Sequence, residues 1–241
     1  MRSLSLAVAA ITVASLAGCG VLPEGPPPLP PTFVPVVEVS ARPDGLVTST
    51  DGFTNVQRIS MRVRGNTCTQ FINGSAWVLN ENTLITNRHV IEGAQNLEVT
   101  SYDGRDYTVT SSVLSTVVDL AMMTVDAEFT EFAVISADGP EIGDQLSIVG
   151  YPNGDRLETN TGRYYASVPD TLDNSPDFVY AIAAASRPGS SGSPVANQLG
   201  EIVGVLYAGD EGENSYAVKL SSLTVFLEDT STHKPNPFVC N

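Results

Sequence analysis

The sequence predicts an all-β fold with one short helix near the C-terminus. From Arg58 onward, short apolar or alternating runs are separated by Gly, Asn and Asp, at the spacing typical of a β-sandwich or a β-barrel. Few windows sustain the period of a helix. A change of composition at residues 136–144, SADGPEIGD, divides the expected strands into two sets of similar number.

The first residues read as a targeting segment rather than as part of the fold. Arg2 precedes the apolar run LSLAVAAITVASLAG, which has the length of a signal-peptide core and is too short for a membrane span. The four residues LAGC at 16–19 resemble the lipobox of bacterial lipoproteins. The resemblance implies a lipoprotein signal peptide over 1–18 and lipidation of Cys19. The alternative is an ordinary signal peptide that happens to contain a cysteine.

The chain has three cysteines, an odd number for an exported protein. If Cys19 carries lipid, Cys68 and Cys240 remain as a pair, and a disulfide between them can persist outside the cytoplasm. Closing so long a loop stabilises the fold by about 4 to 5 kcal/mol in the chain-entropy model. Two unpaired buried cysteines are the alternative.

A proline-rich segment follows Cys19. Prolines as dense as those of GVLPEGPPPLPPTFVP hold a chain extended, so residues 19–45 are interpreted as a lipidated cysteine and a semi-rigid tether. An unstructured tail without a spacing role has the same composition. About 190 residues remain for the folded part, which is enough for one large domain or two small packed ones.

The formal charge of −15 argues against nucleic-acid binding and against adhesion to anionic lipid. The sequence contains two histidines and neither a C-x-x-C motif nor a Walker loop, so we expect no metal site and no cofactor.

Two windows favour a helix. A turn or so of helix is expected after His89, and LSSLTVFLED near the C-terminus places Leu220, Leu223, Phe226 and Leu227 on one helix face, which predicts a helix over about 220–229. Residues 231–241 are expected to form a C-terminal tail. The expected strands are RISMRVR, AWVLN, TLITN, NLEVTSY, YTVTSSVLS, LAMMTV, QLSIVGY, ETNTGRYYASV, FVYAIAAA, SPVAN and EIVGVLYAG.

Three short segments carry residues that are suited to acyl transfer. LITNRHVIEG contains His89, STVVDLAMMTV contains Asp119, and RPGSSGSPV contains serines between glycines. Each has a plain explanation by itself: a core histidine, an aspartate at a strand end, a turn. Together they supply what a serine nucleophile needs, namely an imidazole that accepts its proton and a carboxylate that orients the imidazole. A G-x-S-G turn also brings backbone N–H groups to a developing oxyanion.

The segments TNRHV, DLAMM and GSSGSPV resemble the histidine, aspartate and serine motifs of the chymotrypsin-fold (trypsin-like) serine peptidases, in the order of that family. GSAWVLNENTLITNRHVIEGA and IGDQLSIVGYPNG resemble HtrA-like peptidases, and S-G-S-P also occurs in the glutamyl endopeptidase branch. The resemblance implies two packed six-stranded antiparallel β-barrels, over about 55–136 and 137–220, followed by the short C-terminal helix. The peptidase domain would cover residues 46–230.

The resemblance also implies roles for particular residues. His89 would be the general base and later the acid, Asp119 its orienting partner and Ser191 the nucleophile. The N–H groups of Gly189 and Ser191 would form the oxyanion hole. Ser190 is the rival nucleophile, but it stands at the variable position of G-x-S-G. The other histidine, His233, is a weak competitor because it lies in the proline-rich tail.

The pocket for the residue before the cleaved bond is built in this family from the segment before the serine and the strand after it. In this chain, the two segments supply Ala185, Ser186, Leu206 and Tyr207 as the expected pocket residues. They include neither an acidic residue for Lys or Arg nor the histidine of glutamate-specific relatives, so we expect small or medium apolar side chains. Arg187 is unusual beside such a site, and the sequence offers no physical explanation for it.

The sequence thus predicts a membrane-tethered, extracytoplasmic lipoprotein of the bacterial cell envelope that hydrolyses protein or peptide substrates. A catalytically silent peptidase-like binding or regulatory module is the first alternative, although such proteins usually lose a residue of the triad. An adhesive or structural lipoprotein with a β-sandwich is the second, and it would leave the three motifs unexplained.

Overall fold

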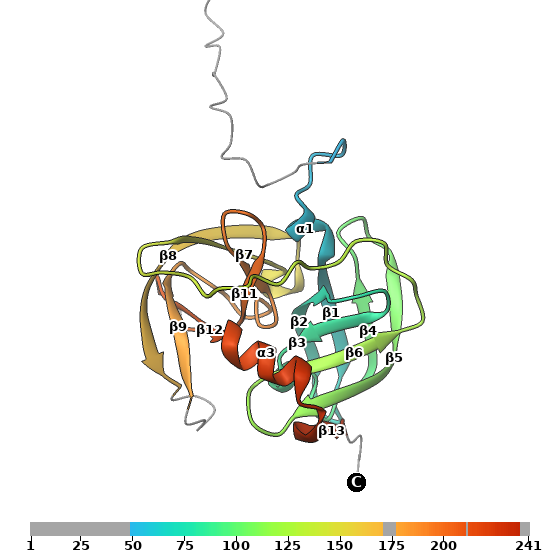
Figure 1. Cartoon of the computed structure of the whole chain (residues 1–241). Helices are drawn as coiled ribbons and strands as arrows, with labels where there is room; N and C mark the ends of the chain where they lie inside the picture. The colour runs from blue at the N-terminus through green and yellow to red at the C-terminus, as the bar shows by residue number, and fades with distance from the viewer. Residues whose placement is uncertain (1–48, 171–176, 211, 237–241) are drawn as a thin grey trace, which may run out of the picture. The chain divides into compact units, whose positions relative to one another are not determined.

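The computed structural model of the chain describes residues 49–170, 177–210 and 212–236. The expected signal peptide, Cys19, the whole proline-rich tether and Cys240 lie outside these residues. Within them, strands form two antiparallel sheets, each closed on itself (Figure 1). Closure excludes the β-sandwich alternative and confirms the expected pair of six-stranded barrels.

The first barrel is made by the strands of residues 60–125. Its order is β5-β4-β1-β2-β3-β6, and pairing of β5 with β6 closes it. Large apolar side chains of these strands, among them Trp77, Leu84 and Ile85, are fully buried. The strands are β1 (Ser60–Asn66), β2 (Phe71–Val78), β3 (Thr83–Thr86), β4 (Gln95–Thr100), β5 (Asp106–Ser115) and β6 (Ala121–Val125).

The second barrel follows a connection that contains the predicted break at 136–144. Its order is β10-β11-β12-β9-β8-β7, closed by pairing of β10 with β7. A separate apolar cluster that includes Leu146, Ile182 and Leu206 fills it. The strands are β7 (Gln145–Gly150), β8 (Glu158–Pro169), β9 (Phe178–Ala183), β10 (Pro194–Ala196), β11 (Ile202–Gly209) and β12 (Ser215–Lys219).

Both expected helices are present, and one helix was not expected. The short helix α2 (Arg88–Ile91) contains His89, and α3 (Leu220–Glu228) buries Leu223 and Phe226. The additional helix α1 (Asn55–Ile59) begins with a capping box, in which the Thr54 hydroxyl accepts from the N–H of Gln57 and the Gln57 side chain accepts from the N–H of Thr54. A 3₁₀ turn, η2 (Pro152–Gly154), follows β7.

The start of the C-terminal segment is more ordered than a tail. After the 3₁₀ turn η3 (Thr230–Thr232), the short strand β13 (His233–Pro235) pairs with β5, so the chain returns from the second barrel to the first (Figure 1). The prolines that suggested a tail are compatible with this strand because β13 stands at a sheet edge.

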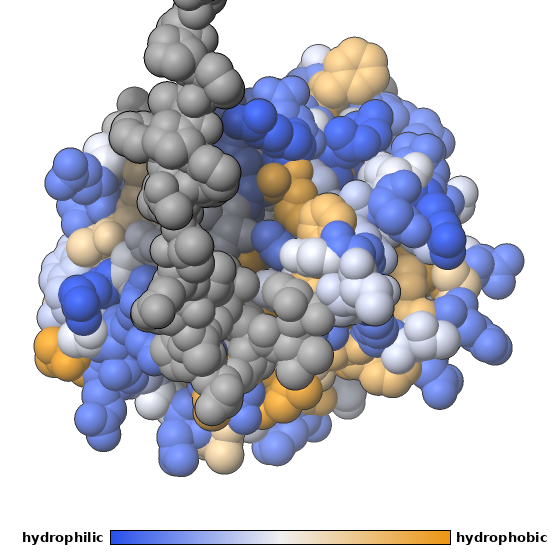
Figure 2. Space-filling model, turned by 90° about the horizontal axis from the view of Figure 1, so that it is seen from above, coloured by the Kyte–Doolittle hydropathy of each residue, from blue (hydrophilic) through white to orange (hydrophobic). Residues whose placement is uncertain are grey.

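Figure 2 shows the molecule from above, relative to Figure 1. Where described residues are visible, this surface is mainly hydrophilic, with hydrophobic residues scattered over it. The most exposed large apolar side chains, Phe71, Ile142, Leu199 and Val225, belong to four different segments. Single exposed apolar residues are normal on a protein surface and mark no docking face.

Candidate active site

His89 and Asp119 meet beside the end of β3. Nδ1 of His89 lies 2.5 Å from Oδ2 of Asp119, and the backbone N–H of His89 donates to Oδ1 at 2.9 Å. A carboxylate accepts hydrogen bonds and donates none, so Nδ1 carries a proton and the neutral ring keeps its lone pair on Nε2. The side chain of His89 is 49% exposed, whereas that of Asp119 is 6% exposed. The pair can therefore accept a proton on the solvent side.

The loop before β6 holds the buried carboxylate in place. The hydroxyl of Ser115 accepts from the N–H groups of Val117 and Val118, at 3.1 and 3.2 Å, and so shapes the turn that leads to Asp119. The amide of Asn87 donates to the backbone carbonyl of Asp119 at 2.7 Å. A carboxylate is costly to bury unless its oxygens are hydrogen-bonded, and the two N–H groups of His89 meet that requirement.

The turn that contains Ser191 packs against the first barrel just before His89. Gly192 has a φ of +89°, and a Cβ atom there would lie 1.9 Å from the carbonyl oxygen of Ser75 and 2.5 Å from Oγ1 of Thr86. Only glycine allows this approach. Thr86 ends β3 three residues before His89, so the three sequence motifs meet at the junction of the barrels.

The hydroxyl of Ser191 donates to the carbonyl oxygen of Tyr207 at 3.3 Å. Among the described residues it makes no hydrogen bond to His89. Rotation about the Cα–Cβ bond of Ser191 redirects this hydroxyl. Contacts between a nucleophile and its base are often long or poorly aligned without substrate.

Two backbone N–H groups of the turn that contains Ser191 lack an acceptor among the described residues. Within the described parts of the chain, the N–H groups of Gly189 and Ser191 donate to no acceptor, whereas those of Ser190 and Gly192 donate to Arg187 and Leu206. The carbonyls of the two peptide units that carry the free N–H groups are both held: Pro188 accepts from Asn153 at 2.5 Å, and Ser190 from Ser193 at 3.1 Å. In a trans peptide the N–H points opposite to the carbonyl, so both free groups have a fixed direction.

The two neighbouring serines differ in accessibility. Ser190 is 4% exposed, and its hydroxyl accepts from the N–H of Arg187 at 3.4 Å. Ser191 is less buried and lies next to the free N–H groups. The geometry favours Ser191 over Ser190 as the reacting residue.

A small cavity of about 160 Å³ opens beside Ser191. Ser186 and Leu206, two of the four predicted pocket residues, line it. Ala185 does not, and Tyr207 does not because its hydroxyl turns away to donate to Asp170 at 2.9 Å. The lining also includes Arg187, Pro188, Ser190, Ala208 and Gly209.

Arg187 has a structural partner that the sequence did not suggest. Its guanidinium pairs with the carboxylate of Glu158 at the start of β8, and Arg156 lies 3.5 Å from the other carboxylate oxygen. The pair joins the turn before Ser191 to β8. Since the Arg187 side chain is 51% exposed, solvent screens the interaction.

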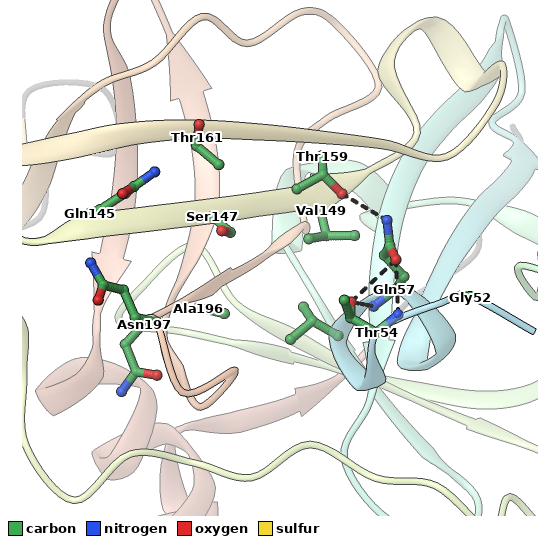
Figure 3. Close-up of a pocket in the computed structure, with 12 residues that line it drawn as sticks. Gly52, Thr54, Gln57, Gln145, Ser147, Val149, Thr159, Thr161, Ala196 and Asn197 are labelled. Atoms are coloured by element: carbon green, nitrogen blue, oxygen red, sulfur yellow. Dashed lines mark hydrogen bonds between the residues drawn. The ribbon is translucent and has the colours of Figure 1, made fainter. Parts of the chain in front are cut away.

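A second cavity, of about 440 Å³, lies between α1 and the outer face of the second barrel (Figure 3). Gln57 spans its edge, since its amide donates to the hydroxyl of Thr159 at 3.1 Å and its carbonyl oxygen accepts from Thr54. The other lining residues are Gly52, Val56, Gln145, Ser147, Val149, Thr161, Ala196, Asn197 and Gln198. None of these side chains titrates, so the cavity offers no acid or base for catalysis.

The structure also bears on the expected disulfide, on metal binding and on membrane-spanning helices. Cys68 is disulfide-bonded, while Cys19 and Cys240 lie outside the described residues, so the predicted Cys68–Cys240 pairing stays a prediction. The described residues contain no group of three or more His, Cys, Asp or Glu side chains that could hold a metal ion. No helix in the described ranges is long and apolar enough to cross a membrane.

One contributor to the site was not predicted. Asn153, whose N–H holds the Pro188 carbonyl, has a φ of +58°, and it begins the Asn-Gly pair after β7. Asn-Gly is a turn signal that could have marked this position as special, but no local signal shows that the turn reaches Pro188.

The sequence matches the family model of the trypsin-like peptidase domain over residues 74–205, more than half of the chain. A probable periplasmic serine endoprotease, DegP-like, from Chlamydia trachomatis is 32% identical over 149 residues. This alignment covers 60% of the present chain and 30% of the relative, so the chain spans less than a third of that protein's length.

Solved structures show the same fold. The active form of the Rv3671c protease from M. tuberculosis has a TM-score of 0.66 at 22% identity, over 77% of this chain and 85% of that one. The HtrA-type protease AlgW with a tripeptide has a TM-score of 0.63 at 21% identity, over 72% and 62% of the two chains. Matching barrels, together with the family match that contains His89, Asp119 and Ser191, lead to one assignment: the chain belongs to the trypsin-like peptidase domain family.

Proposed function

We propose that this chain is a serine endopeptidase that hydrolyses peptide bonds through an acyl-enzyme, with Ser191 as nucleophile, His89 as general base and acid, and Asp119 as the group that orients His89. The observation that carries the proposal is the meeting of the His89–Asp119 pair with a turn whose Gly189 and Ser191 N–H groups lack any acceptor among the described residues. The Chlamydia relative, described as a probable serine endoprotease, supports the same reaction.

The reaction follows from these groups. Nε2 of His89 takes the proton of Ser191 while Oγ forms a bond to the substrate carbonyl carbon, and the N–H groups of Gly189 and Ser191 stabilise the resulting oxyanion. His89 gives that proton to the leaving amine as the C–N bond breaks, which leaves an ester on Ser191. Water then attacks the ester, His89 takes its proton and returns it to Ser191, and the acid product leaves.

Fluorophosphonate labelling tests this assignment. We expect the purified protein to be labelled at one serine, and Ser191→Ala to abolish both labelling and peptide hydrolysis. Ser190→Ala is the matched control and should keep the label, because Ser190 is buried and its hydroxyl is already hydrogen-bonded. Labelling that survives Ser191→Ala contradicts the assignment. A well-folded wild type that neither labels nor hydrolyses peptides would favour the alternative of a silent binding module.

We further propose that the cavity beside Ser191 takes small or medium apolar side chains before the cleaved bond. Leu206 is one of the residues that line it, and Ser186 approaches Gly209 so closely that a Cβ there would lie 2.2 Å from the Ser186 hydroxyl. The described residues that line the cavity include no carboxylate. A peptide library should therefore be cleaved mainly after residues such as Ala or Val. Cleavage dominated by Arg, Lys or Glu would contradict this preference.

We propose that the protein acts outside the cytoplasm, tethered by a lipid on Cys19. The LAGC motif supports this location, as does the description of the Chlamydia relative as periplasmic. In detergent partitioning, wild type should enter the detergent phase and Cys19→Ala should remain in the aqueous phase. Equal partitioning of the two would contradict lipid anchoring.

A further inference from the structure

Ser75 of β2 makes contacts to both residues of the proposed oxyanion hole. Its backbone N–H donates to the carbonyl of Ser191 at 2.8 Å, and its hydroxyl donates to the carbonyl of Gly189 at 2.9 Å. The same hydroxyl accepts from the backbone N–H of Tyr151 at 2.9 Å. Ser75 is 0% exposed, so water does not replace any of these bonds.

The two bonds from Ser75 belong to a series of hydrogen bonds to the carbonyls of the Ser191 turn. Five successive carbonyl groups, from residue 187 to residue 191, each accept a hydrogen bond, and two of the five donors belong to Ser75. The carbonyl of Gly189 lies between the two peptide units that carry the free N–H groups. Holding it restricts rotation of both neighbouring units, and therefore restricts where the N–H groups of Gly189 and Ser191 can point.

The hydroxyl and the backbone of Ser75 have different sequence requirements. Any residue except proline at position 75 would supply the backbone N–H for Ser191. The bridge from Tyr151 to Gly189 needs a side chain that donates and accepts at once, at a distance that serine reaches. The space is small, since a Cβ at Gly150 would lie 2.7 Å from the Ser75 hydroxyl oxygen.

We propose that the hydroxyl of Ser75 is a positioning group for the oxyanion hole: it fixes the Gly189 peptide from the first barrel and so aims the two N–H groups at the substrate oxygen. It does not touch the substrate and transfers no proton. This inference rests on the proposed peptidase function, and it adds a residue of the first barrel to a site whose oxyanion donors all belong to the second.

The test compares Ser75→Ala with Ser60→Ala. Ser60 is an equally buried serine of the first barrel, and its hydroxyl also donates to backbone carbonyls, those of Val56 at 2.7 Å and Val149 at 3.3 Å, neither of which belongs to the Ser191 turn. Steady-state kinetics on a peptide substrate should show a fall of about 10- to 100-fold in kcat for Ser75→Ala with KM within about twofold, because the lost interaction acts on the transition state. Ser60→Ala should keep kcat within about twofold.

Two further readouts separate positioning from loss of stability. The Ki of a peptide boronate, whose tetrahedral adduct places an oxygen in the oxyanion hole, should rise in parallel with the loss of kcat in Ser75→Ala. Ser75→Cys, with a weaker donor of similar size, should give an intermediate kcat. Thermal unfolding of all variants confirms that each is folded at the assay temperature.

Each outcome gives a decision. If wild type is labelled and active but Ser75→Ala keeps its kcat and boronate affinity, or if Ser60→Ala loses kcat equally, the positioning role is wrong and the peptidase function stands. If wild type neither labels nor turns over, the peptidase function is overturned and the positioning role with it. Selective loss in Ser75→Ala supports both.

Discussion

Asp119 combines a buried carboxylate with two hydrogen bonds to His89. Its carboxylate is nearly inaccessible, yet both oxygens accept from His89, one from the ring and one from the backbone. The two bonds fix the orientation of the ring and the nitrogen that carries the proton. In the proposed mechanism the aspartate acts on Ser191 through the imidazole, and its effect on the reaction can be separated from its effect on folding.

Asp119→Asn should lower kcat/KM by about three to four orders of magnitude, because an amide NH₂ facing Nδ1 favours the wrong tautomer. The variant keeps the size of the side chain, so its thermal unfolding should change little. Asp138→Asn, at an exposed position, is the control and should retain activity. A kcat/KM within tenfold of wild type in Asp119→Asn would contradict the assigned role.

Tyr151 gives a stability effect that depends on pH. Burial raises the pKa of its phenol from 10.0 to about 12. The unfolded chain ionises this group near pH 10, whereas the folded protein keeps the proton until about pH 12. Its contribution to the free energy of unfolding is therefore complete below pH 10 and is lost as the pH rises through 12, a change of about 2 to 3 kcal/mol.

Urea unfolding of wild type and Tyr151→Phe between pH 9 and 12 measures this contribution. The free energy of unfolding should fall more steeply with pH in wild type than in the variant. At pH 9 the variant should already be slightly less stable, because it lacks the hydrogen bond from the Tyr151 hydroxyl to the carbonyl of Ser60. Parallel pH curves would show that Tyr151 is not the group responsible.

At the scale of elements, the C-terminal segment supports the helix that carries His89. The side chain of Asn236 accepts from the N–H of Gly93 at 2.9 Å and donates to the carbonyl of Ile91 at 2.8 Å. These are groups at the C-terminal end of α2, where backbone groups lack partners within the helix. Strand β13, paired with β5, holds Asn236 in place.

Asn236→Ala should loosen the end of α2, with a fall of several-fold in kcat/KM and faster hydrogen exchange around Gly93. Asn236 makes a third side-chain hydrogen bond, to the Ser112 hydroxyl. Asn197→Ala is a matched control, since Asn197 likewise makes three, to Leu199 and Glu201 in the turn after β10. It should change stability without changing exchange at Gly93. Equal exchange at Gly93 in Asn236→Ala and wild type would contradict the support by Asn236.

The sequence predicted elements well where the signal is local. Alternating apolar runs marked the strands, and the apolar face of Leu220, Leu223 and Phe226 marked α3. Strand β13 was missed because it is short, contains proline and is defined by pairing with β5, which lies far away in the chain. Ser75 and Asn153 were missed for the same reason, since their contacts to Gly189 and Pro188 join distant segments.

At the scale of the whole molecule, the triad motifs were found because each has its own local pattern, and the fold only had to bring them together. Ser186 and Leu206 line the cavity beside Ser191, whereas Ala185 and Tyr207 do not, because the residues that line a cavity depend on the directions of their side chains. Tyr207, for example, turns to Asp170. Long-range pairing also governs the disulfide, of which the described residues contain only Cys68.

We predict that Cys68 pairs with Cys240. Asn236 is anchored on the first barrel, which also contains the β1–β2 connection with Cys68, and only three residues lie between Asn236 and Cys240. Non-reducing peptide mapping should find a linked Cys68–Cys240 pair, and Cys240→Ser should lower the free energy of unfolding by about 2 to 5 kcal/mol. Recovery of Cys68 linked to Cys19 would contradict this pairing and also the lipid on Cys19.

The return of the chain to the first barrel has a consequence for biogenesis. Synthesis proceeds from the N-terminus, so the strands of the first barrel are available long before β13 and Asn236. The helix with His89 receives its last contacts only when the residues after the second barrel arrive. Maturation of the site that contains His89 thus depends on residues synthesised after the second barrel, and a chain interrupted before β13 would lack the support of its own histidine.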